Sequence, residues 1–180
     1  ALGLTMQRIS CFFKLLSLFA LFCNGGWGEV INGAHKVLCD NPKIYLIENF
    51  LSFSECDHII KAARAQLARS TVVDLQSSGN VVDNARTSEG MFFPQFSKDP
   101  ILKSIEKRIA KLTQIPIENG EAIQVLRYSV GGEYRPHYDF FDPKTTGGAI
   151  HLNRGGQRIA TVIMYLHTTE EGGETVFPYV

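Results

Sequence analysis

Residues 121–142, EAIQVLRYSVGGEYRPHYDFFD, limit the possible folds of this chain more than any other stretch. Residues 122–128 have the composition of a β-strand, and a Gly-Gly pair then provides a turn into the segment that carries His137 and Asp139. Two strand residues separated by one position direct their side chains to the same face. We therefore predict that this imidazole and this carboxylate converge on one point.

A histidine and a carboxylate that converge are two of the three ligands in a 2-His-1-carboxylate iron(II) site, which leaves positions open for a co-substrate and dioxygen. The pattern His-x-Asp is also common by chance, and an ordinary ion pair at the surface is the alternative interpretation. Motifs elsewhere in the chain are needed to distinguish the two.

The 180 residues suit one globular domain, because 44% of them are hydrophobic and 11% are aromatic. Lysine plus arginine equal aspartate plus glutamate at 18 each, so the formal net charge is zero. A nucleic-acid partner would require a basic surface, and this charge balance gives no reason to predict one.

The first 26 residues have the pattern of a targeting segment. Arg8 and Lys14 precede the apolar run of residues 15–23, as in a secretory signal peptide or an uncleaved signal anchor. The alternative is a buried core helix, but this run has no polar face. We therefore expect a protein of the endoplasmic reticulum and secretory pathway, lumenal and, where the segment is retained, anchored in the membrane. Residues 27–41, rich in Gly, Asn and Asp, are predicted to be a linker.

Of the four cysteines, Cys39 and Cys56 belong to the predicted folded part. An oxidising compartment would permit them to form a disulfide. Cys56 lies on the apolar face of a predicted helix, however, where a buried free thiol is the simpler interpretation. The sequence alone leaves both possibilities open.

Two amphipathic helices are expected in the first two-thirds of the chain. Ser52 and Glu55 have the spacing of a capping box, and apolar residues follow at helical intervals through residues 54–69. Asp99 is predicted to cap a second helix, which has a proline in its first turn and ends before Pro116.

The remaining segments with β-branched or aromatic composition are predicted strands, namely residues 43–50, 71–75, 81–82 and 157–166. Residues 143–156, rich in Gly and Thr, are predicted to be a mobile loop. Helices followed by a run of strands, without βαβ alternation, predict an α+β domain with a largely antiparallel sheet. The Gly-rich turns of the second half suit a sandwich or jelly roll.

Three motifs in this order and spacing, YSVGGEYRPHYDFF, GGQRIATVIMYL and EEGGETVFP, resemble the catalytic domain of prolyl 4-hydroxylases. The resemblance covers residues 42–180 and includes the upstream stretch RTSEGMFF. It implies an α+β fold with a double-stranded β-helix, or jelly-roll, core and flanking N-terminal helices. It also implies iron(II) as cofactor, 2-oxoglutarate as co-substrate and L-ascorbate as reductant. The implied reaction hydroxylates peptidyl proline at C4 and releases succinate and carbon dioxide.

Carried over position by position, the resemblance implies roles for individual residues. His137 and Asp139 would be iron ligands, and Tyr128 and Thr175 would contact 2-oxoglutarate through their hydroxyl groups. The peptide groove would be lined by a further set, Arg86, Ser88, Tyr134 and Arg158. Within that set we assign Arg158 to catalysis and the other three residues to substrate binding. The alternative is structural, because the tyrosine suits a core and the two arginines suit an ordinary surface.

The resemblance further implies a second histidine ligand and, beyond it, a Lys or Arg that pairs with the far carboxylate of 2-oxoglutarate. Neither occurs before Val180. His151 lies in the predicted loop and His167 at a position that the family leaves variable, so we predict that neither is the third ligand. We therefore expect the sequence to be an incomplete fragment, itself inactive, that lacks the later core strands and leaves a hydrophobic strand such as residues 159–166 unpaired.

Two alternatives to a prolyl hydroxylase stay open. An oxygenase that acts on another residue, such as lysine, would share these motifs. A catalytically inactive module that binds proline-rich or collagen-like peptides through Tyr134 would need no third ligand. A downstream histidine followed by Lys or Arg would favour an enzyme over the binding module, and the oligomeric state is not predicted.

Overall fold

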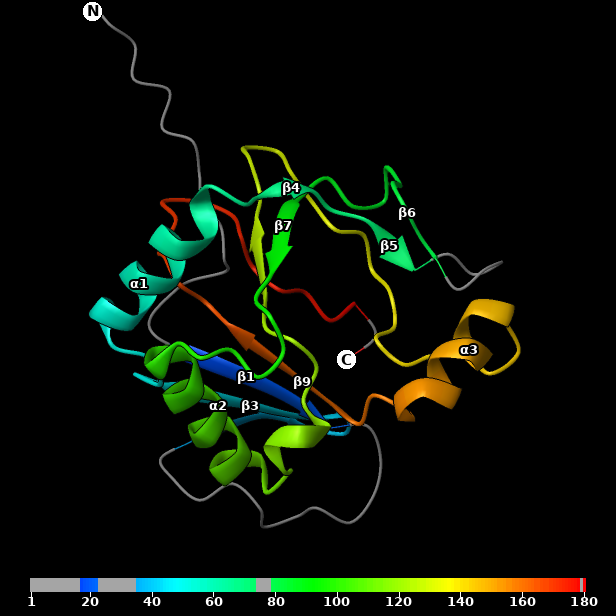
Figure 1. Ribbon diagram of the computed structural model, residues 1–180, viewed down its shortest axis with the longest axis horizontal. Coiled ribbons are helices and arrows are strands. Elements are labelled where there is room, and N and C mark those ends of the chain that lie inside the picture. Colours follow the sequence, from blue (N-terminus) through cyan, green and yellow to red (C-terminus); the bar gives the residue numbers. More distant parts are fainter. Residues whose placement is uncertain (1–16, 23–34, 74–78, 179) are drawn as a thin grey trace, which may run out of the picture.

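The computed structural model describes residues 17–22, 35–73, 79–178 and 180. Within these residues the chain combines α-helices with three small sheets, and every strand pairing is antiparallel. Figure 1 shows two helices, α1 and α2, on one side of the largest sheet, with a third helix, α3, at the opposite end of the molecule. The predicted α+β class and the largely antiparallel sheet are therefore confirmed.

The largest sheet has the strand order β2-β3-β1-β9. Its strands are β1 (Ser17–Phe22), β2 (Lys36–Asp40), β3 (Lys43–Glu48) and β9 (Ala160–Met164). Residues 36–40 were expected in a linker, and this prediction is wrong, because they form a hairpin with β3 around a cis Asn41-Pro42 peptide. The remainder of the predicted linker that precedes residue 35 lies outside the described residues.

β1 occupies the interior of this sheet, between β3 and β9, so that Ala20 faces Tyr45 on one side and Val162 on the other. It coincides with part of the apolar run for which we predict targeting, and the rest of that run lies outside the described residues. The expectation that residues 159–166 are left unpaired is wrong for one edge of β9, since that edge is hydrogen-bonded to β1. In the described part of the chain no helix has the length and apolar character needed to cross a membrane.

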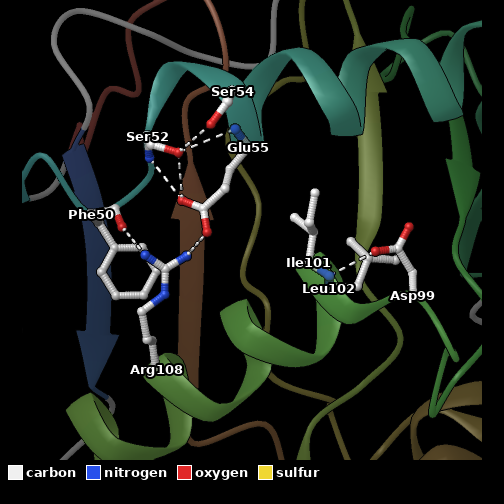
Figure 2. Close-up of polar contacts among 8 residues, drawn as sticks. All are labelled: Phe50, Ser52, Ser54, Glu55, Asp99, Ile101, Leu102 and Arg108. Carbon is white, nitrogen blue, oxygen red and sulfur yellow. Dashed lines mark hydrogen bonds and ion pairs between the residues drawn. The ribbon is translucent and has the colours of Figure 1, made fainter.

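Helix α1 (Phe53–Arg64) begins at the predicted capping box. The Ser52 hydroxyl accepts from the Glu55 amide at 3.2 Å, and the Glu55 carboxylate accepts from the Ser52 amide at 2.8 Å. Figure 2 shows that the same carboxylate also accepts from Arg108 of α2, which donates to the Phe50 carbonyl as well. The cap of one helix is therefore tied to the side of the other.

Helix α2 (Pro100–Thr113) begins as predicted, because the Asp99 carboxylate accepts from the Ile101 and Leu102 amides (Figure 2). It ends at Gln114, which takes a left-handed conformation with φ of 56°. The residue before a proline is poorly suited to a helix, so Pro116 fixes this end. Helix α1 is shorter than the predicted 54–69, because the chain turns after it into β4.

The second sheet has the order β4-β7-β8 and the third is the pair β5-β6. Their bounds are β4 (Ala68–Arg69), β7 (Glu89–Phe92), β8 (Gln124–Arg127), β5 (Val72–Val73) and β6 (Asn80–Val81). The antiparallel pairing of β5 with β6 confirms strand structure within or next to the predicted segments 71–75 and 81–82, and residues 74–78 between them lie outside the described residues. A short 3-10 helix, η1 (Ile117–Asn119), joins α2 to β8.

The core lies where α1 and α2 pack against the sheets. Its buried members come from both helices, from β7 and β8, and from residues next to α1, β7 and β9, namely Leu51, Cys56, Ile59, Ala63, Met91, Phe93, Leu102, Ile105, Val125, Tyr165 and Leu166. A smaller cluster joins Leu112 of α2 to Tyr45 and Ile47 of β3. Together these contacts fix the helices against the strands that lead into the candidate site.

Residues 143–156 are not the mobile loop that their glycine content predicts. Most of them form α3 (Thr146–Gly155), which is capped by the Thr145 hydroxyl accepting from the Gly148 amide at 3.0 Å. A Cβ on Gly148 would collide with the Asp142 carbonyl, so glycine is required for this close approach. The predicted strand 157–166 is likewise shorter, with only residues 160–164 in β9.

Cys39 and Cys56 are both free thiols, and Cys56 is buried against the core, as the simpler interpretation predicts. Burial raises the pKa of the Cys56 thiol to about 11, because the thiolate would lose its hydration. At pH 8 only about one molecule in a thousand then carries a Cys56 thiolate, the form that reacts with alkylating reagents.

We expect iodoacetamide at pH 8 to modify Cys39 within minutes and to leave Cys56 unmodified until denaturant is added. Peptide mass spectrometry of native and urea-unfolded samples, labelled side by side, measures both rates. Modification of Cys56 in the native protein at the rate seen in urea would contradict this prediction. A Cys39→Ser variant, labelled in the same way, shows the reaction of Cys56 without that of Cys39.

Candidate metal centre

The segment that carries His137 and Asp139 is held against residues 85–87. Arg86 and Tyr134 are directly opposite one another in an antiparallel bridge, flanked by backbone hydrogen bonds from Thr87 to the Glu133 carbonyl and from Arg135 to the Ala85 carbonyl, both 2.9 Å. Beyond this bridge the segment is not a regular strand. The predicted strand geometry is therefore wrong for His137 and Asp139, although the predicted convergence is confirmed.

The two side chains meet with 3.2 Å between His137 Nε2 and Asp139 Oδ1. The other ring nitrogen, Nδ1, lies 2.8 Å from the Arg135 carbonyl oxygen, to which it donates, and this turns Nε2 toward the carboxylate. Asp139 Oδ2 accepts a 2.6 Å hydrogen bond from the Thr161 hydroxyl on β9. Each of the two side chains is nearly two-fifths exposed, at 39% and 38%, so solvent and ligands can reach the pair.

The electrostatics of the pair follow from these contacts. The hydrogen bond from His137 holds the pKa of Asp139 below its usual value, and the Thr161 hydroxyl acts in the same direction. Burial opposes a charged imidazole at His137, but the bonds to Asp139 and to the Arg135 carbonyl together raise its pKa above the ordinary value. Asp139 is therefore an anion at neutral pH, and a cation that binds Nε2 must displace the imidazole proton.

The donor set fits one divalent cation. Two metal–ligand bonds of about 2.1 Å that meet at a right angle separate their ligand atoms by about 3 Å, close to the observed 3.2 Å. A carboxylate oxygen and an imidazole nitrogen are ligands that suit iron(II). Among the described residues, no third His, Cys, Asp or Glu gathers with this pair. His151, one of the two histidines that we predict are not ligands, stacks on Phe141 at 4.8 Å instead.

Tyr134, predicted to line a peptide groove, stacks on His137 with 3.7 Å between ring centroids and an interplanar angle of 23°. Partial burial raises the pKa of its phenol. Arg86, from the same predicted set, is buried and lies over the Tyr134 ring, with its guanidinium carbon 4.8 Å from the ring centroid. Ser88 is fully buried, at 0% exposure, and donates to the Ser70 hydroxyl at 2.9 Å.

Arg158, predicted to be catalytic, braces the backbone of the site. It makes two hydrogen bonds to the Glu121 carboxylate, at 2.5 and 2.8 Å, and this pairing raises the pKa of its guanidinium. It also donates to the Asp139 carbonyl at 3.3 Å and lies over the Phe141 ring, 4.5 Å from the centroid. The side chain of the adjacent Gln157 makes two hydrogen bonds to the backbone of Phe141. It accepts from the amide at 2.7 Å and donates to the carbonyl at 2.9 Å.

Sequence reasoning did not identify three of these contributors, Glu121, Gln157 and Thr161. Thr161 had a detectable signal, because it is a lone hydroxyl residue among the aliphatic residues of β9. Glu121 and Gln157 had none, since each acts on a residue that lies far away in the sequence.

Tyr128 and Thr175 are the residues predicted to contact 2-oxoglutarate, and neither belongs to the pair of His137 and Asp139, called the metal pair below. Tyr128 is buried at the end of β8, close enough to Tyr134 for the two phenols to influence each other. The Thr175 hydroxyl lies 2.8 Å from the hydroxyl of Tyr165, which is itself buried. Among the hydrogen bonds of the described residues, that of Thr175 leads to Tyr165 and not to His137 or Asp139.

A family model places this arrangement among known proteins. The model described as "2OG-Fe(II) oxygenase superfamily" matches residues 123–179, which include the metal pair, the Tyr134 stack, Thr161 and Thr175. The family's name specifies iron(II) and 2-oxoglutarate, and the carboxylate–imidazole donor set is consistent with that metal.

Curated proteins of Arabidopsis thaliana are similar over most of the chain. Prolyl 4-hydroxylase 5 is 44% identical over 152 residues, 84% of this chain and 48% of that protein. Prolyl 4-hydroxylase 1 is 46% identical over 144 residues, 79% of this chain and 49% of that protein. This chain spans about half the length of the curated relatives that it matches. These matches support a prolyl 4-hydroxylase catalytic domain of the 2OG-Fe(II) oxygenase superfamily in this chain.

Proposed function

We propose that this protein hydroxylates peptidyl proline at C4, in a reaction that converts 2-oxoglutarate and dioxygen to succinate and carbon dioxide. The observation that carries the proposal is the convergence of His137 Nε2 and Asp139 Oδ1 at 3.2 Å within the region that matches the family. When bound there, iron(II) would supply the oxygen chemistry, with L-ascorbate as the reductant that keeps the metal in its ferrous state.

The chain's own residues then have definite tasks. Asp139 is kept ionised by its hydrogen bonds, and the Arg135 carbonyl holds the imidazole of His137 with Nε2 toward the metal position. Arg158 and Thr161 fix the backbone and the carboxylate of Asp139. Tyr128 and Thr175 are proposed to hold 2-oxoglutarate, with the Thr175 hydroxyl oriented by Tyr165.

The substrate that we propose is a proline-rich or collagen-like peptide. The half-buried ring of Tyr134 provides an aromatic surface beside the metal pair, and aromatic surfaces suit the extended polyproline conformation. We further propose a jelly-roll core for the whole enzyme and a lumenal site of action in the endoplasmic reticulum. The basic and apolar pattern of residues 6–23 supports the latter, with a cleaved signal or a retained membrane anchor as its two forms.

The test is a turnover assay on the full-length protein with iron(II), ascorbate, dioxygen and 2-oxoglutarate. We expect succinate to form in proportion to hydroxyproline when a proline-rich or a collagen-like peptide is supplied. Amino-acid analysis of the peptide measures the product, and an Asp139→Ala variant is the control because it lacks one proposed metal ligand while retaining Tyr134.

The other outcomes identify the alternatives. Hydroxylation of a lysine-containing peptide in place of the proline peptides would show an oxygenase of different specificity. Peptide binding without any formation of succinate would show a binding module. Turnover by residues 24–180 alone would contradict the expectation that this sequence is an incomplete fragment.

A further inference from the structure

Arg86 is a buried cation whose charge is not balanced by a carboxylate. It is only 8% exposed, and none of the ion pairs among the described residues includes it. Its donors go to neutral oxygens instead, those of Ser88 Oγ at 3.1 Å, the Thr71 carbonyl at 3.1 Å and Gln124 Oε1 at 3.3 Å. A guanidinium in such surroundings requires further compensation, because burying an uncompensated charge costs free energy.

The face of the Tyr134 ring provides that compensation. Arg86 and Tyr134 are opposite residues of an antiparallel bridge whose flanking backbone hydrogen bonds leave the side chains of this pair close together. The guanidinium carbon lies 4.8 Å from the ring centroid, within the range of a cation–π contact. Because the guanidinium is also held on three sides by its neutral acceptors, the position of the Tyr134 ring is fixed relative to the β4-β7-β8 sheet.

A fixed Tyr134 ring also restrains His137, one of the two candidate metal ligands. Its ring stacks on the imidazole of His137 at 3.7 Å, a separation at which a change in the tyrosine rotamer would leave the imidazole unsupported. Among the described residues, the other restraints on the His137 ring are the Arg135 carbonyl and Asp139, and the segment that carries it has no regular secondary structure.

We propose that Arg86 is a positioning residue that holds Tyr134, and through it the imidazole of His137, in the orientation that binds the metal. Ser88 and Gln124 belong to the same support, since they fix the guanidinium. This assignment differs from the substrate contact that the resemblance implies for Arg86. Its metal-binding part rests on the proposed function, whereas the restraint on the imidazole does not.

The first experiment follows His137 in the metal-free, full-length protein. In proton NMR with selectively labelled histidine, the ring current of the stacked tyrosine should shift the imidazole proton signals of His137 upfield. We expect Arg86→Met to abolish this upfield shift, Arg86→Lys to retain part of it, and Tyr134→Leu to abolish it while leaving the buried arginine in place. Tyr134→Leu assigns the shift to the tyrosine ring, and Arg86→Lys keeps the test decisive where a buried Arg86→Met protein unfolds, because a full wild-type shift in the lysine variant would also contradict the proposal.

The matched control is Arg127→Met. It removes another partly buried arginine, which lies in β8 and pairs with Glu89 of β7. It should leave the His137 signals unchanged. A folded Arg86→Met protein whose His137 signals equal those of the wild type would overturn the proposal.

The second experiment measures Mn(II) affinity of the same proteins by calorimetry. We expect Arg86→Met to weaken Mn(II) binding by about threefold to tenfold. This effect is smaller than that of removing a residue hydrogen-bonded directly to a metal ligand. In the Tyr134→Leu background, the same substitution should add little, because both act on the same imidazole. A raised KM for peptide with unchanged Mn(II) affinity would instead show that Arg86 contacts the substrate. Absence of Mn(II) binding by the wild type would refute the proposed function, and the NMR result would still decide the role of Arg86.

Discussion

Replacing His137 with alanine in the full-length protein is expected to weaken Mn(II) binding by more than about 100-fold and to abolish turnover. Loss of an outer partner of a metal ligand costs roughly 10- to 100-fold, and the loss of a ligand itself should exceed that range. The variant should remain folded, because the side chain is nearly two-fifths exposed and belongs to no core cluster of the described residues. Calorimetric titration with Mn(II) and circular dichroism of the same samples test both parts.

Two companion variants sharpen this test. Thr161→Val removes the hydroxyl that donates to Asp139 Oδ2 at 2.6 Å while conserving volume, and should weaken Mn(II) binding by roughly 10- to 100-fold. His58→Ala removes a histidine of α1 that pairs with Asp99, the N-cap of α2, and not with His137 or Asp139, so it should leave the affinity unchanged. Retention of wild-type affinity by the His137 variant would eliminate the imidazole as a ligand and, with it, the proposed metal centre.

The second large effect concerns stability. Ile105→Ala is expected to lower the free energy of unfolding by about 2–5 kcal/mol, because it removes buried methylene and methyl groups and leaves a cavity between α2 and the main core. The side chain has 0% exposure, so nothing from solvent can replace the lost contacts. Urea unfolding followed by circular dichroism measures the change.

Phe53→Ala provides the control, since that larger apolar side chain at the start of α1 is 77% exposed. Its removal should change the unfolding free energy by no more than about 0.5 kcal/mol. Equal losses in the two variants would mean that Ile105 is not part of a close-packed core. The milder Ile105→Val should fall between them, at about 0.5–1.5 kcal/mol.

The helix starts are predictable from sequence because capping is local. Ser52 with Glu55, and Asp99 with the amides that follow it, act within one turn, and both predictions are confirmed. Helix α3 is not predictable in this way, since its glycines argue against a helix. It depends on contacts outside itself, such as the stack of His151 on Phe141 and the close approach of Gly148 to Asp142.

The candidate site shows the same division between local and distant causes. The spacing of His137 and Asp139 predicts their convergence, but the actual cause is the Arg135 carbonyl on one side and Thr161 of β9 on the other. The partners of Arg86 and Arg158 could not be derived from spacing, because Gln124 and Glu121 lie 38 and 37 positions away. The assignments of Tyr128, Thr175 and the groove residues stay predictions.

Because β1 lies in the interior of the largest sheet, any cleavage of the chain after residue 22 would alter that sheet. Adjacent strands lie about 4.8 Å apart, so removal of residues 17–22 would separate β3 from β9 by roughly 9.6 Å, beyond the reach of any backbone hydrogen bond. A chain cleaved after residue 26 would have a vacancy one strand wide, with unpaired donors and acceptors along both walls. Such a form would keep the four-strand order of this sheet only with another strand in the place of β1.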